Sequence, residues 1–235
     1  MAGRALGYGT RTRQSPAPLR LVLAVAGLWI GLNLAGVLVA WARAYTAEFG
    51  ATPATVALDL RRDDAPGRTI LIAANRPRPE RGDVIGHLWV IWPEAPGPEP
   101  TRAFGFYADS QPAAAAALAG ALIAPWGFAT GAPVVEGGLA SDDGEPFERA
   151  IAVTVDDAVF SRALDVHRAW SQRTDYRIRP PLDAAPAACQ DYVFAIAGAL
   201  GLAVPARDWT QLPASTFLDL AAANPASAPA TRRPR

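Results

Sequence analysis

The feature that most constrains this chain is an uncharged apolar stretch near its start, residues 21–42, with the sequence LVLAVAGLWIGLNLAGVLVAWA. About 22 residues of α-helix are enough to cross a hydrocarbon core roughly 30 Å thick. Trp41 and Tyr45 stand at the far end, and amphipathic aromatic rings favour the membrane interface. The pattern predicts a transmembrane helix, with a cleaved signal peptide as the alternative interpretation.

The basic residues set the expected orientation of this helix. Four arginines precede the apolar stretch: Arg4, Arg11, Arg13 and Arg20. No acidic residue appears before Glu48. By the positive-inside rule, residues 1–20 form a cytoplasmic tail and the rest of the chain is exported. We therefore expect a single-pass protein of the cell inner membrane whose C-terminal domain is periplasmic or extracellular, with the cytoplasmic membrane bound through residues 21–42.

Composition excludes several classes of partner. Basic and acidic residues balance at 22 each, so nothing indicates a surface for nucleic acid. One cysteine rules out an internal disulfide bond. One cysteine and two histidines also lack the spacing of a zinc site, so we expect neither a metal nor a cofactor. Of the histidines, His167 falls at the margin of the packed face of a predicted helix, where a structural role is the main interpretation.

The exported part reads as one α+β domain over residues 54–220. Alternation and β-branching predict strands at 55–60, 69–73, 86–92, 101–107 and 151–155. Helices are predicted at 113–124, 156–170 and 215–223. Residues 131–148 are turn-rich and carry no predicted element. Residues 224–235 are Pro, Ala, Ser and Arg without periodicity, and we expect a disordered tail.

Two of these strands predict an antiparallel hairpin. Residues 86–92 give the strongest strand pattern in the chain, and 101–107 follow after the loop PEAPGPEP. Alternation places His87 and Trp89 on one face of the first strand and Val90 on the other. Folding the hairpin about the middle of its loop brings His87 opposite residues 105–107.

The single cysteine falls in the first turn of a predicted apolar helix. Pro186 suits the start of that helix, Asp183 is a candidate N-cap, and Gly201 is the expected stop. At a helix N-terminus the unpaired N–H groups and the positive end of the dipole favour thiolate over thiol. Cys189 therefore fits either an activated nucleophile or a small buried hydrophobe.

The order of a histidine strand followed by a cysteine helix resembles the circularly permuted papain-like cysteine hydrolases, the NlpC-type and lecithin:retinol acyltransferase-like group. The matching segments are Gly86-His87-Leu88-Trp89-Val90, then Phe104-Gly105-Phe106-Tyr107, then Cys189-Gln190-Asp191-Tyr192-Val193. The resemblance implies a permuted papain-like domain with a small antiparallel sheet packed on helices. It implies Cys189 as nucleophile, His87 as base, and Tyr107 or Asp109 as the polar residue that orients the imidazole. The residue before the cysteine is often Asn in this group, whereas here it is Ala188.

The function implied is a membrane-anchored, extracytoplasmic thiol hydrolase or acyltransferase that acts on an amide or ester bond through a Cys-His pair. Peptide, peptidoglycan or lipid-linked acyl groups are the natural substrates in a bacterial periplasm. The alternative is a catalytically inactive papain-like module that binds a partner or serves as scaffold in an envelope complex. A sulfur and an imidazole held apart by core side chains would favour that alternative.

Overall fold

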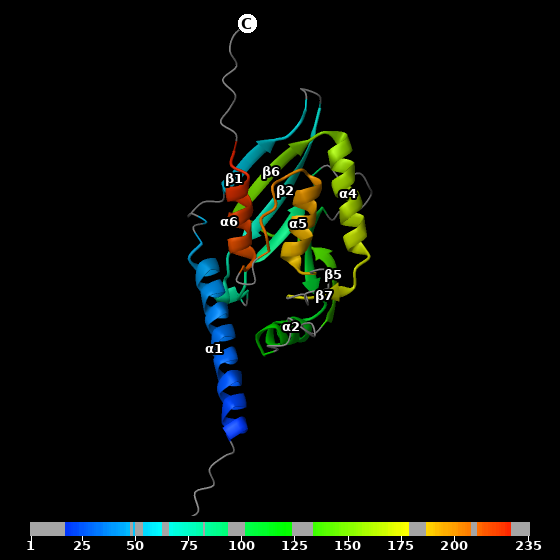
Figure 1. The fold of residues 1–235 in the computed structure, drawn as a ribbon. Coiled ribbons are helices and arrows are strands. Elements are labelled where there is room, and N and C mark those ends of the chain that lie inside the picture. Colours follow the sequence, from blue (N-terminus) through cyan, green and yellow to red (C-terminus); the bar gives the residue numbers. More distant parts are fainter. Residues whose placement is uncertain are drawn as a thin grey trace, which may run out of the picture.

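The computed structural model describes residues 17–47, 49, 54–62, 66–81, 83–93, 102–123, 134–178, 187–207 and 211–226. These residues form an α+β fold in which helices pack on a mixed sheet, beside one long N-terminal helix (Figure 1). The predicted α+β class is therefore confirmed. The predicted tails lie mostly outside the described residues, which omit 1–16 and 227–235.

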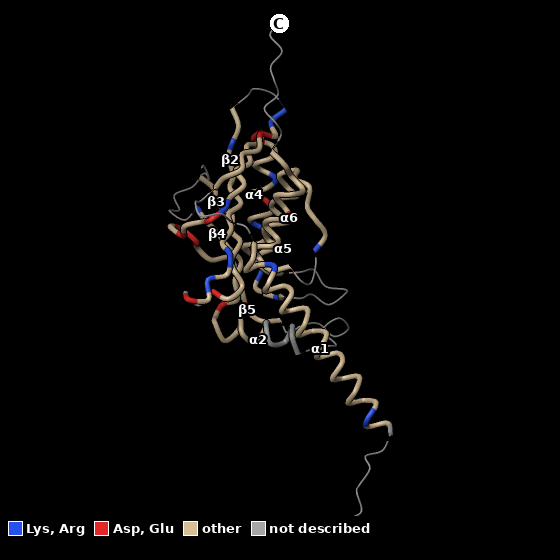
Figure 2. Tube along the Cα trace, turned by 90° about the vertical axis from the view of Figure 1, so that its left-hand side faces the viewer, with Lys and Arg blue, Asp and Glu red and all other residues tan. Residues whose placement is uncertain are grey.

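The long N-terminal helix is α1 (Ala17–Tyr45). Within the described residues it is the one helix long and apolar enough to cross a membrane, and it contains the whole predicted stretch 21–42. Figure 2 shows that α1 carries charge only near its two ends. Leu21 and Leu38 are each 67% exposed, and a contiguous apolar surface of this kind is unfavourable in water.

The sheet has seven strands. Their order is β1 (Ala54–Asp59), β6 (Arg149–Val155), β2 (Arg68–Asn75), β3 (His87–Ile91), β4 (Ala103–Ala108), β5 (Val135–Ser141) and β7 (Asp175–Tyr176). Strands β1 and β6 pair in parallel and every other neighbouring pair is antiparallel. A small antiparallel sheet was predicted, whereas the sheet is mixed because β1 and β6 pair in parallel. A parallel pair needs a long crossover between its strands, and such distant pairing leaves no local pattern in the sequence.

Four further helices are described: α2 (Gln111–Ile123), α4 (Asp157–Ser171), α5 (Cys189–Ala199) and α6 (Pro213–Ala223). A single 3-10 turn, η1 (Pro79–Arg81), precedes β3. The predicted helices 113–124, 156–170 and 215–223 correspond to α2, α4 and α6. Each predicted end lies within two residues of the observed one. Figure 1 shows α4, α5 and α6 side by side over the sheet. Helix α5 packs against β3 and β4, which brings the cysteine helix onto the histidine hairpin.

Alternation along β3 divides its side chains between two clusters, as predicted. Val90 and Trp92 lie in the main core with Ile196 of α5. Trp89 is fully buried in a smaller cluster with Ala73 and neighbouring residues. Burial on both sides makes β3 a rigid platform, and His87 stands at its first position.

Candidate active site

Cys189 is the first residue of α5, as the sequence predicts. The N-cap position is held by Ala188, so the suggestion of Asp183 as N-cap was wrong; Asp183 lies outside the described residues. The first turn is instead closed by Asp191, whose Oδ2 accepts the backbone N–H of Ala188 at 3.0 Å. Its Oδ1 accepts a hydrogen bond from Nε of Arg207 at 2.9 Å. These contacts fix the backbone that carries the thiol.

The predicted hairpin is confirmed. Strands β3 and β4 pair antiparallel with Trp89 opposite Gly105, and the same register continued by two residues places Tyr107 opposite His87. The imidazole of His87 stacks on the Tyr107 ring with centroids 4.5 Å apart, and on Trp89 with centroids 5.2 Å apart. Two aromatic neighbours therefore hold the imidazole at the start of β3.

The structure brings the predicted pair together, because Cys189 lies close enough to His87 to raise the pKa of the imidazole. Burial by itself lowers the pKa of His87, but Asp142 and Cys189 outweigh it and raise the pKa to about 9. An imidazole with such a pKa keeps its proton at neutral pH. The pair therefore favours an imidazolium beside the sulfur, which is the charge arrangement of an activated thiol.

The residue that orients the imidazole is Asp142, which was not predicted. Its Oδ2 lies 3.2 Å from Nε2 of His87. The hydroxyl of Tyr107 donates to Oδ1 of the same carboxylate and also contacts Nε2. Since both partners engage Nε2, Nδ1 is the ring nitrogen that remains for the thiol.

Tyr107 supports this arrangement as a neutral donor. Burial and the neighbouring charge of Asp142 raise the pKa of its hydroxyl well above the usual value, so it stays protonated. The prediction that Tyr107 is near the imidazole therefore agrees with the geometry. Its role here is to hold the carboxylate of Asp142 against His87.

Asp109, the other predicted orienting residue, lies away from the pair. It follows the end of β4 and its side chain is exposed, while its backbone N–H donates to the carbonyl of Glu136 at 3.0 Å. Among the described residues no hydrogen bond joins its carboxylate to His87. The structure does not bring Asp109 to the pair, because β4 ends at Ala108 and the chain continues into α2.

Gly105 leaves the room that the histidine and its carboxylate need. A Cβ atom at this position would lie 2.5 Å from Oδ2 of Asp142 and 2.5 Å from Nε2 of His87. Any larger residue would push these two side chains apart. The glycine of β4 is therefore part of the site, although it carries no functional group.

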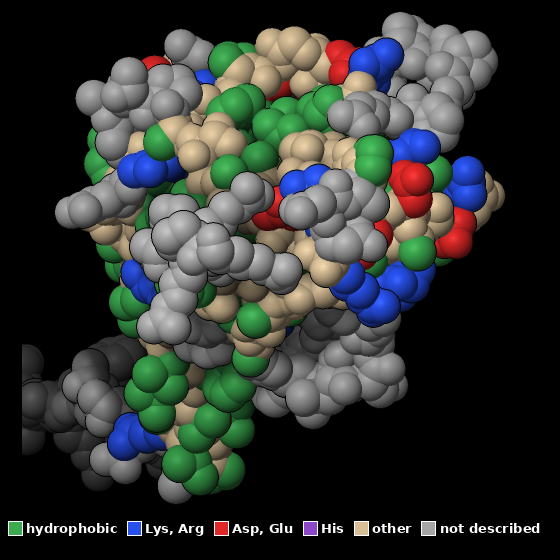
Figure 3. Space-filling model, turned by 90° about the horizontal axis from the view of Figure 1, so that it is seen from above, with side chains coloured by type: hydrophobic (Ala, Val, Ile, Leu, Met, Phe, Trp, Pro, Cys, Tyr) green, Lys and Arg blue, Asp and Glu red, His purple; other side chains and the backbone are tan. Residues whose placement is uncertain are grey.

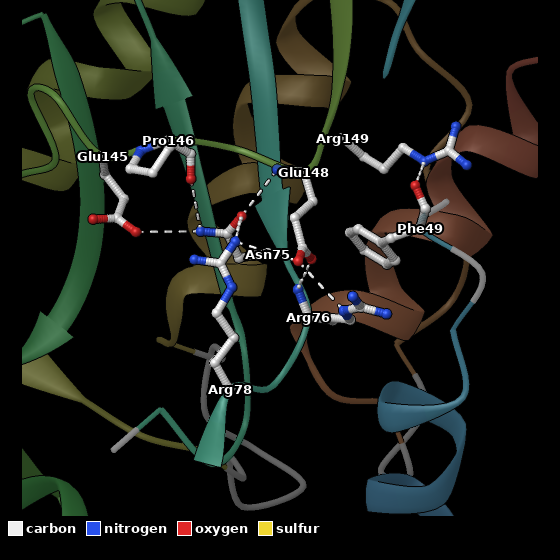
Figure 4. A network of polar contacts seen from close by, with 8 residues as sticks. All are labelled: Phe49, Asn75, Arg76, Arg78, Glu145, Pro146, Glu148 and Arg149. Atoms are coloured by element: carbon white, nitrogen blue, oxygen red, sulfur yellow. Dashed lines mark hydrogen bonds and ion pairs between the residues drawn. The ribbon is translucent and has the colours of Figure 1, made fainter. Parts of the chain in front are cut away.

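The segment that follows Asp142 is anchored by Asn75, which is paired with His87 across β2 and β3. The buried amide of Asn75 donates to Oε1 of Glu145 at 3.3 Å and to the carbonyl of Pro146 at 3.0 Å (Figure 4). Its Oδ1 accepts the backbone N–H of Glu148 at 3.0 Å. One side chain thus ties the segment after Asp142 to the strand beside the histidine.

His167 has a structural role, in agreement with its predicted place. Its Nδ1 lies 2.9 Å from the hydroxyl of Tyr192, and its ring packs against Trp92 and Phe104. Burial lowers its pKa to about 4, so it is neutral and suited to the core.

The site is shielded from bulk solvent. Cys189 is 5% exposed, and the side chains of His87 and Asp142 are 15% and 7% exposed. Within the part of the chain that the structure describes, no group of three or more His, Cys, Asp or Glu residues is placed to hold a metal ion.

Comparisons with protein-family models, with curated proteins and with solved structures give no match for this chain. The resemblance to permuted papain-like hydrolases therefore stays a prediction from the sequence. The candidate active site consists of four side chains, Cys189, His87, Tyr107 and Asp142.

Proposed function

We propose that this chain is a membrane-anchored, extracytoplasmic thiol hydrolase or acyltransferase that acts on an amide or ester bond. One observation carries the proposal: His87 lies against the carboxylate of Asp142 at 3.2 Å and close enough to Cys189 for the thiol to raise its pKa. A nucleophile within reach of a base, with the base oriented by a third group, is the arrangement that covalent acyl transfer requires.

The chemistry follows from these positions. The Cys189 sulfur attacks the carbonyl carbon, and the His87 imidazolium gives its proton to the nitrogen or oxygen that leaves. A thioester to Cys189 remains. Water or an acceptor hydroxyl or amine then attacks the thioester and gives its proton to His87, while the thiolate departs. N–H groups in the first turn of α5 are the candidate donors to the oxyanion in both steps.

The anchor supplies the location in this proposal. Helix α1 spans the cytoplasmic membrane through residues 21–42, with the four N-terminal arginines on the cytoplasmic side. The domain then lies outside that membrane, where peptide, peptidoglycan or lipid-linked acyl groups are available. Protease added to intact spheroplasts tests the topology: the domain should be digested and the N-terminal tail protected.

A small thiol-directed electrophile tests the catalytic pair. Cys189 is the only cysteine, so mass spectrometry of the intact chain reports its modification directly. We expect labelling at pH 7 to be faster than that of free cysteine and to slow at least tenfold in His87→Ala. The variant His167→Gln is the matched control and should label as the wild type. Equal rates in wild type and His87→Ala would contradict the proposal.

One observation favours the alternative, a non-catalytic binding or scaffold module. Cys189 is only 5% exposed, so a substrate carbonyl needs a local opening to reach the sulfur. Labelling distinguishes the two functions. A scaffold would leave Cys189 unlabelled by small and bulky electrophiles alike, whereas an enzyme would be labelled at least by the small one.

A further inference from the structure

The residues that follow β4 form a second uncharged segment. Residues 110–135 contain no Asp, Glu, Lys, Arg or His, and α2 (Gln111–Ile123) occupies the first half of them. An apolar helix of roughly 10–14 residues is too short to span a bilayer. It is typical of either a core helix or a re-entrant or interfacial membrane segment.

The first two turns of α2, over residues 111–117, do not have the burial of a core helix. Ala114, Ala115 and Ala116 are exposed, and Ala117 is the one residue of these turns that enters the main core, at 1% exposed. A water-facing helix surface normally carries charged or polar side chains. In these two turns Gln111 is the one exposed polar side chain, and the other exposed residues are Pro112 and three alanines.

The position of α2 relative to α1 distinguishes the remaining possibilities. The two helices pack against each other, and Figures 1 and 2 both show α2 beside the middle of α1 and not beyond its end. The buried positions of α1 include Asn33 and Ala40, which are 7% and 6% exposed. Asn33 precedes Ala42 by nine positions (42 − 33), about 14 Å along the helix and near the middle of a core about 30 Å thick.

We propose that α2 is a second membrane element, inserted beside α1 into the leaflet on the side of the domain, with its 114–116 face against lipid tails. The inference rests on the proposed membrane span of α1. The opposite end of the molecule differs in character, because Figure 3 shows basic and acidic side chains of both signs there. Insertion of the uncharged helix α2 and hydration of the charged end is the arrangement that satisfies both.

Insertion of α2 fixes where the candidate site lies. Tyr107 is the second-last residue of β4, and α2 begins three residues after β4 ends at Ala108. The end of the sheet that carries Tyr107 and His87 is therefore next to the inserted helix. The candidate site then lies at the level of the lipid headgroups.

Spin labels in the full chain, reconstituted in phospholipid nanodiscs, test the proposal. With Cys189→Ser as background, single cysteines are placed at Ala115 on α2, at Leu28 on α1 and at Ala158 on α4, all three exposed. Collision with oxygen, which concentrates in lipid, is compared with collision with a water-soluble nickel chelate. Ala114→Cys is the second α2 site should Ala115→Cys not fold.

We expect the labels at Ala115 and Leu28 to collide at least threefold more with oxygen than with the chelate, and the label at Ala158 to show the reverse. A label at Ala115 that behaves like the one at Ala158 would overturn the insertion of α2. Protection of Ala115 from both reagents would also overturn it, in favour of a protein partner or a second copy on this face. An aqueous Leu28 would instead refute the span of α1, so failure of the anchor is distinguishable from failure of α2.

Discussion

Replacing Asp142 with Asn is the sharpest test of how the proton on His87 is held. The substitution keeps the shape of the side chain and an oxygen for Nε2, but it removes the negative charge. Among the groups that raise the pKa of His87 from 6.5 to about 9, Asp142 makes the largest contribution. That increase of about 2.5 corresponds to about 3 kcal/mol in favour of the imidazolium. Without the charge, burial lowers the pKa again.

The expected result is a fall in the pKa of His87 from about 9 to below 7, which NMR of the imidazole carbons measures directly. Less than half of the imidazole is then protonated at pH 7, so less imidazolium remains beside the Cys189 sulfur. Alkylation of Cys189 by iodoacetamide at that pH should slow at least twofold in Asp142→Asn. The comparison is between variants, so the low exposure of the sulfur affects both rates alike.

Asp109→Asn is the matched control. It removes the same charge from an exposed position just before α2. It should leave both the titration of His87 and the alkylation rate unchanged. An unchanged His87 midpoint in Asp142→Asn would refute the assignment of Asp142 as the orienting residue. Equal losses in both variants would show that the effect is long-range electrostatics and not the contact at Nε2.

Three further substitutions or conditions test the surroundings of the pair. Gly105→Ala should lower the labelling rate of Cys189 at least tenfold, because the added Cβ would lie 2.5 Å from both His87 and Asp142. The control is Gly138→Ala in β5, which should label at the wild-type rate because its Cβ would meet only a carbonyl oxygen at 3.8 Å. Asn75→Ala should lower the free energy of unfolding in urea by about 2–3 kcal/mol, since it leaves buried partners unsatisfied, and unaltered stability would contradict the anchoring role. The raised pKa of His87 should stabilise the fold fully below pH 6.5, with the contribution of about 3 kcal/mol lost as the pH rises through about 9. Urea unfolding at pH 6 and pH 9.5 measures this loss, and a loss of equal size in His87→Ala would assign it to other groups.

The two main residues of the site could be predicted because local patterns determine their positions. The spacing of apolar residues up to Gly201 places Cys189 in a first helical turn, and Gly201 indeed has φ of +88° just past α5. Strong alternation on both sides of a proline-rich loop sets the hairpin that brings Tyr107 opposite His87. In both cases the deciding contacts lie within about 20 residues of sequence.

Asp142 could not be predicted, because the strand before it has no strand pattern. β5 contains Gly137 and Gly138, and glycine weakens an isolated strand. The structure shows why glycine is needed there: a Cβ on Gly137 would lie 2.3 Å from the carbonyl oxygen of Tyr107 and 2.5 Å from Cβ of Tyr176. Because β4 and β7 both lie close to β5, residue 137 has to be glycine. The same glycine removes the strand pattern of β5 from the sequence.

The end of α1 adds a constraint on how any substrate reaches the site. Ala44 is fully buried, and Phe49 just beyond the helix packs on Phe217 of α6 with ring centroids 6.0 Å apart. Arg43 also pairs with Asp219 of the same helix at 3.4 Å. The anchor therefore enters the core of the domain and does not act as a flexible tether. If α1 spans a membrane as we propose, a domain joined this way holds one orientation to the bilayer, and the proposed substrate must reach Cys189 at a fixed height above it.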